Sequence, residues 1–261
     1  MRMRKASGLI LAAMAVVPLM AITYGVADGT THPNVGALLA LWTSGARAQI
    51  CSGTLISPTV FLTAAHCTSW MESQGFTRAW VTFDPALSAE AVLHEGTIYT
   101  NPGFNQSQGD PGDVAVIVFD EPVLGITPAS LPPEGLFDRM KDNGALKNMH
   151  FTAVGYGARE PETGAGSKKF GPSGERYMAV SDFNALNNAW LRLSQNQAHG
   201  DGGTCLGDSG GPNFLGAGPN ETSIIAGLTV KGDAVCVSTN VIYRLDTLAA
   251  REFLGNYVIL P

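Results

Sequence analysis

The chain has 261 residues, 45% of them hydrophobic and only 15% charged, which is enough apolar material for one large all-β unit or two small barrels. Its formal net charge is −6, and basic residues cluster only at the extreme N-terminus. This charge balance argues against nucleic acid or an anionic membrane surface as the partner. The 31 glycines and 15 prolines favour many turns over long helices.

The N-terminus has the pattern of a secretory signal peptide. Arg2, Arg4 and Lys5 form a positive region, and an apolar run follows it. This run is too short for a spanning helix, and no later segment reaches the roughly 20 apolar residues that a span requires. We expect residues 1–21 to be removed on export, leaving no stable membrane anchor. The alternative is a segment that stays attached and anchors the protein to a membrane.

Short apolar stretches, rich in β-branched and aromatic residues, recur between segments that contain Gly, Pro, Asn or Asp. Stretches of this kind are typical of strands in a barrel or sandwich and not of βαβ units. The predicted strands are Val35–Trp42, Thr54–Leu62, Trp80–Phe83, Val114–Phe119, Phe151–Val154, Ile224–Val230 and Val235–Val237.

Three further segments have a distinct composition. Leu131–Gly144 contains two runs that break regular structure, and a join between two barrels is predicted there. The stretch Gly157–Gly174, rich in Gly, Pro and charge, is predicted to be a long surface loop. At the C-terminus, Asp246 or Thr247 can cap a helix over Thr247–Tyr257.

Four cysteines, an even number in an exported chain, predict two disulfides. Three pairings are possible, and local spacing favours Cys51 with Cys67 and Cys205 with Cys236. Neither Cys-x-x-Cys nor His-x3-His spacing accompanies these cysteines, so no metal site is expected.

The run from Thr204 to Pro212, TCLGDSGGP, carries the strongest chemical signal. A serine hydroxyl becomes a good nucleophile only when a base removes its proton and the surrounding backbone is held rigid. The glycines around Ser209 allow tight turns and leave backbone N–H groups free to meet a developing oxyanion. A Gly/Ser turn without function would have the same composition, so this run needs partners elsewhere in the chain.

A histidine and an aspartate occur in matching contexts upstream. The run LTAAHC places His66 just after an apolar stretch and beside Cys67, which can tether its loop. Asp113 opens DVAVIVF, an acid at the head of a stretch with the composition of a buried strand. Asp110 and Asp120 compete on chemistry but lack this context. The remaining histidines are interpreted as structural or exposed: His32, His94, His150 and His199.

Taken in the order His66, Asp113, Ser209, these motifs resemble the chymotrypsin/trypsin family of serine peptidases. That order differs from the order in subtilisins and α/β-hydrolases. The resemblance covers a domain of residues 22–261 and implies an all-β fold of two six-stranded antiparallel barrels with a C-terminal α-helix. It would place the first barrel at about residues 22–135, the second at about 136–246 and the helix at about 247–257, with the site between the barrels.

The resemblance also implies a mechanism and a role for each residue. Ser209 would attack the scissile carbonyl, His66 would act as general base and then general acid, and Asp113 would orient the imidazole. The N–H groups of Gly207 and Ser209 would form the oxyanion hole. No metal or organic cofactor is needed, and the family's disulfides agree with the pairing favoured by spacing.

Activation in this family uses a new N-terminal Ile or Val, whose ammonium pairs with the acid before the serine. The corresponding pair here is Ile22 and Asp208. A signal-peptidase cut after Ala21 would free Ile22 at once. A cut after Ala27 fits the cleavage rule better and would discard Ile22, so the sequence leaves both sites open.

The expected specificity pocket departs from the trypsin pattern. Members that cut after Arg or Lys carry an Asp six residues before the serine, where this chain has Gly203, followed by Thr204. The family's Ser-Trp-Gly wall appears as Val-Lys-Gly, ending at Gly232. We expect an apolar or small side chain before the cut bond, although Asp201 or Asp233 would allow Arg-directed cleavage if either entered the pocket.

The sequence thus predicts a secreted monomeric serine endopeptidase that acts on a protein or peptide substrate and can be met by a protein inhibitor. One alternative is a catalytically silent member that serves as a binding module. A second is an esterase-like serine hydrolase, although no helix-forming segment follows Ser209 as the nucleophile elbow of such enzymes requires.

Overall fold

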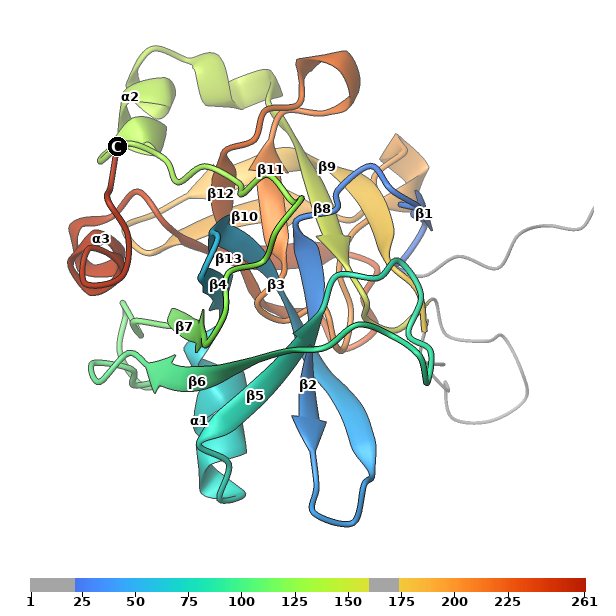
Figure 1. Ribbon diagram of the computed structural model, residues 1–261. Helices are drawn as coiled ribbons and strands as arrows, with labels where there is room; N and C mark the ends of the chain where they lie inside the picture. The colour runs from blue at the N-terminus through green and yellow to red at the C-terminus, as the bar shows by residue number, and fades with distance from the viewer. Residues whose placement is uncertain (1–21, 160–173) are drawn as a thin grey trace, which may run out of the picture.

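Two antiparallel β-barrels form the body of the protein in the computed structural model, which describes residues 22–159 and 174–261 (Figure 1). The first comprises β2 (Val35–Leu41), β3 (Arg47–Ser57), β4 (Val60–Thr63), β5 (Arg78–Thr82), β6 (His94–Thr100) and β7 (Ala115–Phe119). The second comprises β8 (His150–Gly155), β9 (Tyr177–Leu186), β10 (Trp190–Ser194), β11 (Pro212–Leu215), β12 (Ile225–Gly232) and β13 (Thr239–Arg244). Each barrel has six strands, as the sequence predicted. The first closes in the order β2-β3-β4-β7-β6-β5 and the second in the order β8-β9-β10-β13-β12-β11.

The segment that follows Ile22 belongs to the second barrel, although the sequence assigned it to the first. Strand β1 (Val26–Ala27) pairs antiparallel with β9 in the second sheet. The side chain of Ile22 is fully buried against Tyr177 and Ala179. Burial of this apolar side chain and the backbone pairing together fix the start of the described chain.

Two of the predicted strands need correction. The stretch Thr54–Leu62 forms two strands, because a turn at Pro58 and Thr59 separates β3 from β4, and Pro58 has no N–H to give to a ladder. Val235–Val237 is a turn in which Cys236 has a left-handed φ of 55°. The loop predicted over Gly157–Gly174 lies largely outside the described residues.

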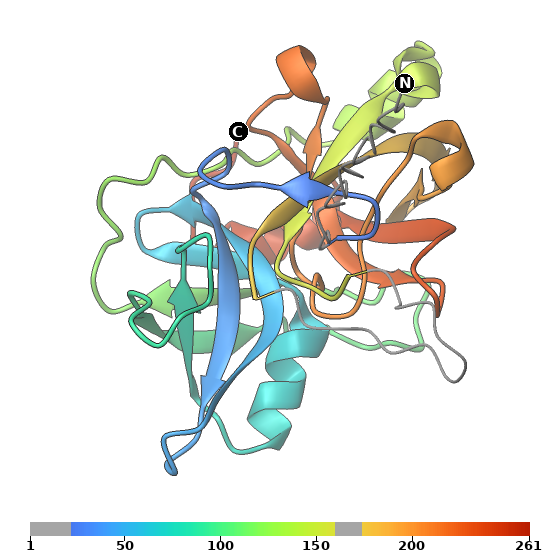
Figure 2. The ribbon, with the colours of Figure 1, turned by 90° about the vertical axis from the view of Figure 1, so that its right-hand side faces the viewer.

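The helices are short and lie at the surface of the barrels. Helix α1 (Ala65–Ser73), which the sequence did not predict, runs along the outside of the first barrel (Figures 1 and 2). Helix α2 (Leu136–Asp142) occupies the predicted join between the barrels. Helix α3 (Leu248–Leu254) ends the fold, with the Thr247 side chain accepting a hydrogen bond from the N–H of Ala250. Single 3₁₀ turns lie at Ala145–Asn148, Gln197–His199 and Gly218–Asn220.

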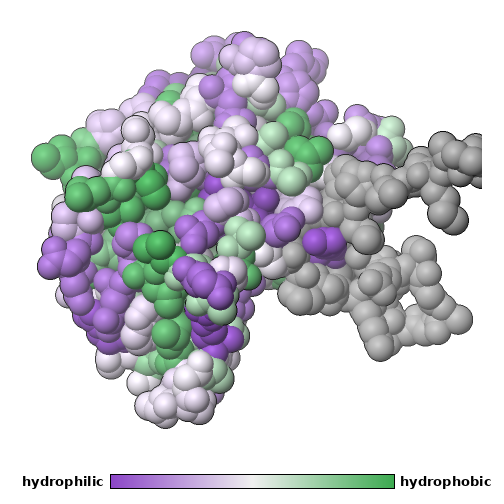
Figure 3. Space-filling model, turned by 45° about the vertical axis from the view of Figure 1, so that its right-hand side comes forward, coloured by the Kyte–Doolittle hydropathy of each residue, from purple (hydrophilic) through white to green (hydrophobic). Residues whose placement is uncertain are grey.

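Apolar side chains fill each barrel and the seam between them. The seam contains residues from both barrels and from α3, including Val35, Val116, Phe214, Tyr243 and Phe253. Burying a large apolar side chain contributes about 1.5–3 kcal/mol, so this shared core holds the two barrels in one arrangement. Exposed hydrophobic side chains form separate patches among hydrophilic ones on the face in Figure 3. No helix in the described part of the chain is long and apolar enough to cross a membrane.

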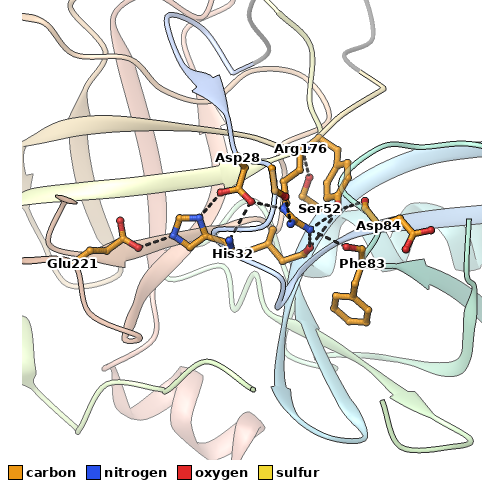
Figure 4. Close-up of polar contacts among 10 residues, drawn as sticks. Asp28, His32, Ser52, Phe83, Asp84, Arg176 and Glu221 are labelled. Carbon is orange, nitrogen blue, oxygen red and sulfur yellow. Dashed lines mark hydrogen bonds and ion pairs between the residues drawn. The ribbon is translucent and has the colours of Figure 1, made fainter. Parts of the chain in front are cut away.

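A buried ion pair joins the N-terminal segment to both barrels (Figure 4). The guanidinium of Arg176, a residue that is 2% exposed, lies 2.7 Å from Asp28 Oδ2 through its Nε. Its NH1 donates to the carbonyls of Val35 and Phe83, and its NH2 to that of Gly29. Because each of the three guanidinium nitrogens donates to an acceptor, the charge is buried with hydrogen-bond partners on all sides of its edge.

His32 extends this ion pair across the molecule. Its Nδ1 contacts Asp28, its Nε2 lies 2.6 Å from Glu221 Oε1, and its ring stacks on Phe214. Burial alone would lower the pKa of His32. The hydrogen bonds to two carboxylates outweigh that effect and raise the pKa to about 9. His32 is therefore a structural cation at neutral pH, one of the two outcomes that the sequence allowed.

Stability should fall on the alkaline side because of His32. Its pKa is higher in the folded chain than in the unfolded chain, so its stabilising effect is complete below about pH 6.5 and is lost as pH rises through about 9. We expect His32→Gln to lower the free energy of unfolding, measured with urea, at pH 6. At pH 9.5 this loss should be smaller by about 2 kcal/mol. A difference that stays constant over this range would contradict the charged assignment.

Candidate active site

His66 makes two hydrogen bonds to one carboxylate, one from its imidazole and one from its backbone. His66 is the second residue of α1, and its Nδ1 lies 2.9 Å from Asp113 Oδ2. The backbone N–H of His66 donates to the other oxygen, Oδ1, at 2.9 Å. Asp113 is 6% exposed, whereas His66 is half-buried. The carboxylate thus fixes the orientation of the ring and leaves Nε2 as the ring nitrogen that Asp113 does not use.

Ser209 lies in a loop that packs directly onto the first barrel. Its carbonyl accepts a 2.8 Å hydrogen bond from the N–H of Ser52 on β3. The next residue, Gly210, has a left-handed φ of 77°, and a Cβ there would lie 2.2 Å from Thr63 Oγ1 and 2.8 Å from the backbone nitrogen of Ala64. The serine loop therefore touches the segment that leads into His66.

The carbonyl of Gly207 is anchored by two side chains that the sequence analysis did not single out. Gln49 Nε2 donates to it at 2.8 Å, and Ser52 Oγ at 3.0 Å. Within the described chain, neither the N–H of Gly207 nor that of Ser209 donates to a carbonyl. In the sequence, the only feature that points to Gln49 is its position two residues before Cys51, which forms a disulfide.

Asp208 is fully buried, and glycines make room for it. A Cβ at Gly155 would lie 2.2 Å from Asp208 Oδ1, and one at Gly157 would lie 2.4 Å from Asp208 Cγ. The carboxylate accepts hydrogen bonds from the N–H groups of Gly157 and Cys205. Among the described residues no basic side chain pairs with it. Burial raises the pKa of Asp208 to about 7, although both N–H donors act to lower it.

A cleft of about 320 Å³ opens beside His66 and Asp113, with walls from both barrels. In one wall, the Lys231 ammonium lies 4.4 Å from the ring centre of Trp190. The wall from the first barrel consists of Gln106, Gln108 and Pro111. The wall from the second barrel consists of Trp190, Val230 and Lys231.

The residues predicted for the specificity pocket lie near Gln195, which the sequence analysis missed. A Cβ at Gly203 would overlap the Gln195 side chain, 2.0 Å from Nε2, and one at Gly232 would lie 3.9 Å from Oε1. Thr204 accepts a hydrogen bond from Gln195 Nε2 through its carbonyl. The carboxylate of Asp233 is engaged by the N–H groups of its own turn, residues 237–239.

Both disulfides form as spacing favoured. Cys51 pairs with Cys67 across the start of α1, and Cys205, which follows Thr204, pairs with Cys236. The sulfurs of Cys51 and Cys67 lie near His66, but a disulfide offers no thiolate to a metal. This cluster is therefore a covalent tether for the histidine segment.

Comparison with known proteins agrees with this arrangement. A family model described as Trypsin matches residues 37–249. The chain belongs to the trypsin family, the chymotrypsin/trypsin-like serine peptidases. Glucanase inhibitor protein 4 of Phytophthora infestans is 25% identical over 201 residues, covering 73% of this chain and 74% of that protein. The fold resembles that of neuropsin, a serine protease of mouse brain, with a TM-score of 0.61 and 20% identity over 86% of this chain and 95% of that one.

Substitution of Gly210 should destabilise the protein more than the strain of a left-handed backbone alone would. We expect Gly210→Ala to lower the free energy of unfolding by roughly 2–5 kcal/mol, because the new Cβ would combine a left-handed φ with the contact to Thr63. Gly218→Ala is the matched control, since its φ is 54° and nothing lies within 4 Å of its Cβ. It should cost only about 1 kcal/mol. Equal losses in urea unfolding would show that the serine loop is not tightly packed.

Proposed function

We propose that this chain is a secreted serine endopeptidase, hydrolysing peptide bonds through an acyl-enzyme on Ser209. The main support for this proposal is the pair of hydrogen bonds between His66 and Asp113 at the edge of the cleft. The packing of Gly210 onto Thr63 supports a nucleophile in the loop beside that pair. Trypsin-family membership supplies the reaction class.

In this proposal Ser209 Oγ attacks the carbonyl carbon while His66 Nε2 takes its proton. Asp113 holds the Nδ1–H tautomer and stabilises the imidazolium. When the tetrahedral intermediate collapses, the C–N bond breaks and His66 gives its proton to the leaving amine. Water then attacks the acyl-enzyme, with His66 again removing and returning a proton, and Ser209 is regenerated.

The oxyanion is stabilised by the N–H groups of Gly207 and Ser209. Such donors are worth about 3–4 kcal/mol each in comparable sites. Gln49 and Ser52 restrain the Gly207 peptide by fixing its carbonyl, which supports a donor pair that is in place before substrate arrives.

Activation would follow from a free amine on Ile22. The uncompensated, buried carboxylate of Asp208 supports an incoming cation as its partner. The buried side chain of Ile22 and the pairing of β1 with β9 support a cut after Ala21. A cut after Ala27 would remove both interactions, together with the bridge between Thr23 and Gly203. Two disulfides are consistent with an oxidising compartment and hence with export.

The mature N-terminus provides a direct test of this activation. We expect mass spectrometry of the secreted protein to find a chain that begins at Ile22. Blocking that amine, by expressing a form with one extra residue before Ile22, should reduce the rate of active-site labelling at least tenfold. A mature chain that starts at Asp28 and labels at a normal rate would exclude the Ile22–Asp208 pair.

Reaction with a fluorophosphonate probe tests the triad. We expect rapid labelling of the processed chain, none for Ser209→Ala, and a loss of several orders of magnitude for His66→Ala. Asp113→Asn should lose about 10⁴-fold, because it favours the wrong imidazole tautomer. Ser44→Ala, in the exposed turn between β2 and β3, is the control and should label like the wild type. Correctly processed protein that does not label would contradict a catalytic role.

One observation favours a second candidate, a non-catalytic binding module. The matched relative is named a glucanase inhibitor, so the family fold can also serve recognition. A processed chain that fails to label yet binds a protein partner would support this function. Labelling together with cleavage of esters but not peptides would indicate the esterase alternative.

A further inference from the structure

A hydrogen bond from the second barrel reaches the segment that carries Asp113. The hydroxyl of Tyr243 donates to Asp110 Oδ1 at 2.8 Å, across 133 positions of the chain. Tyr243 belongs to β13, and Asp110 lies shortly before Asp113 in the connection between β6 and β7. Of the hydrogen bonds found between described residues, this is the one that joins residues 101–113 to the second barrel.

The carboxylate of Asp110 also holds the turn that leads to Asp113. Its Oδ1 accepts a second hydrogen bond, from the N–H of Gly112 at 3.2 Å. Gly112 has a left-handed φ of 62°, and its carbonyl accepts a hydrogen bond from Asn101 Nδ2 at 3.0 Å. Asp113 follows Gly112 directly. A shift of this turn relative to β13 would therefore move the carboxylate that orients His66.

Tyr243 is a rigid support for this contact. Its side chain is fully buried in the seam between the barrels, and its ring meets that of Trp190 edge-to-face, with 5.8 Å between the ring centres. Burial and the hydrogen bond to Asp110 raise the pKa of the Tyr243 hydroxyl. The hydroxyl therefore keeps its proton at neutral pH and remains a donor to the carboxylate, in a charge-assisted hydrogen bond.

The hydrogen bonds of Asp113 itself do not reach the second barrel. Both of its oxygens accept from His66, one from the backbone N–H and one from Nδ1. This pair is thus held within the first barrel, whereas the loop of Ser209 leads into β11 of the second. Proton transfer from Ser209 to His66 requires a fixed distance between them, because a misplacement of about 1 Å can cost roughly 100-fold in rate. The bond between Tyr243 and Asp110 provides a constraint of this kind on the Asp113 side.

We propose that Tyr243 and Asp110 form a positioning pair, which fixes the Asp113 carboxylate relative to the Ser209 loop by tying residues 110–113 to β13. Both residues act through Asp113 on the orientation of His66. Asp110, which competed with Asp113 on chemistry in the sequence, thus has a supporting role at the same site. This inference rests on the proposed peptidase function and adds two positioning residues to it.

Rates of fluorophosphonate labelling in single variants test the pair. We expect Tyr243→Phe and Asp110→Ala each to slow labelling by about 10–100-fold, because each removes the hydrogen bond to β13. Asp110→Asn should retain most of the wild-type rate, since its amide oxygen still accepts from Tyr243 and Gly112. The matched control is Tyr99→Phe, which removes the hydroxyl of a tyrosine that is 42% exposed on β6. It should label like the wild type.

Double variants separate positioning from a general loss of structure. Because Tyr243 and Asp110 act as one unit, Tyr243→Phe should cause no further loss in Asp110→Ala. Because the pair acts through Asp113, Tyr243→Phe should also leave the slow residual labelling of Asp113→Asn unchanged. A loss of merely structural origin would persist in the Asp113→Asn background. Losses that multiply in either background would therefore overturn the proposal, as would an Asp110→Asn variant that labels as slowly as Asp110→Ala.

The wild-type rate distinguishes failure of this inference from failure of the peptidase function. Correctly processed wild type that does not label would remove the function itself. Rapid labelling of the wild type, with Tyr243→Phe equally fast, would remove only the positioning pair. Each variant is labelled below its own melting midpoint, measured by circular dichroism, so that a slower rate does not come from an unfolded protein.

Discussion

The close approach of the loop around Ser209 to the first barrel constrains the whole site. Asp208 enters a space that exists because residues 155 and 157 are glycines, and Gly210 touches the chain that leads to His66. The hydrogen bond from Ser52 to the Ser209 carbonyl joins the two barrels at this point. Van der Waals contact at these distances leaves the loop almost no freedom, so its position follows from how the barrels meet.

The seam between the barrels is in turn secured from the N-terminal side. Arg176 bonds to carbonyls of Val35 and Phe83 in the first barrel and pairs with Asp28 in the leading segment. A buried ion pair is a weak source of net stability, because desolvation offsets the attraction. The pair strongly favours a single native arrangement, since any other arrangement would leave a buried charge without a partner.

Much of the fold and part of the site could be predicted from sequence. Features that depend on residues close together along the chain could be predicted, and features that depend on distant residues could not. Strand β7 is dense in β-branched residues, strand β2 consists of apolar residues and one glycine, and the segment before His66 is apolar. Strands β6 and β9 mix polar with apolar residues, because one face of each is exposed, and were not predicted. Helix α1 follows a strand and has no capping side chain to mark its start.

The residues that sequence reasoning missed act through partners distant along the chain. Gln49 meets Gly207 across 158 positions, and His32 meets Glu221 across 189. Neither has a local motif, so His32 could only be interpreted as structural or exposed. Gln195 was missed for a different reason. A lone glutamine after a strand is common, and only its close approach to Gly203 in the structure distinguishes it.

The space that Gln195 and Gly203 share links these two positions when the sequence changes. A side chain at position 203 would overlap the buried carboxamide of Gln195, because a Cβ there would lie 2.0 Å from Nε2. A shorter residue at position 195 would relieve this overlap, but it would also open a void where the amide was. Substitutions at the two positions are therefore coupled, and a larger residue at position 203 is tolerated best when a shorter one already stands at position 195.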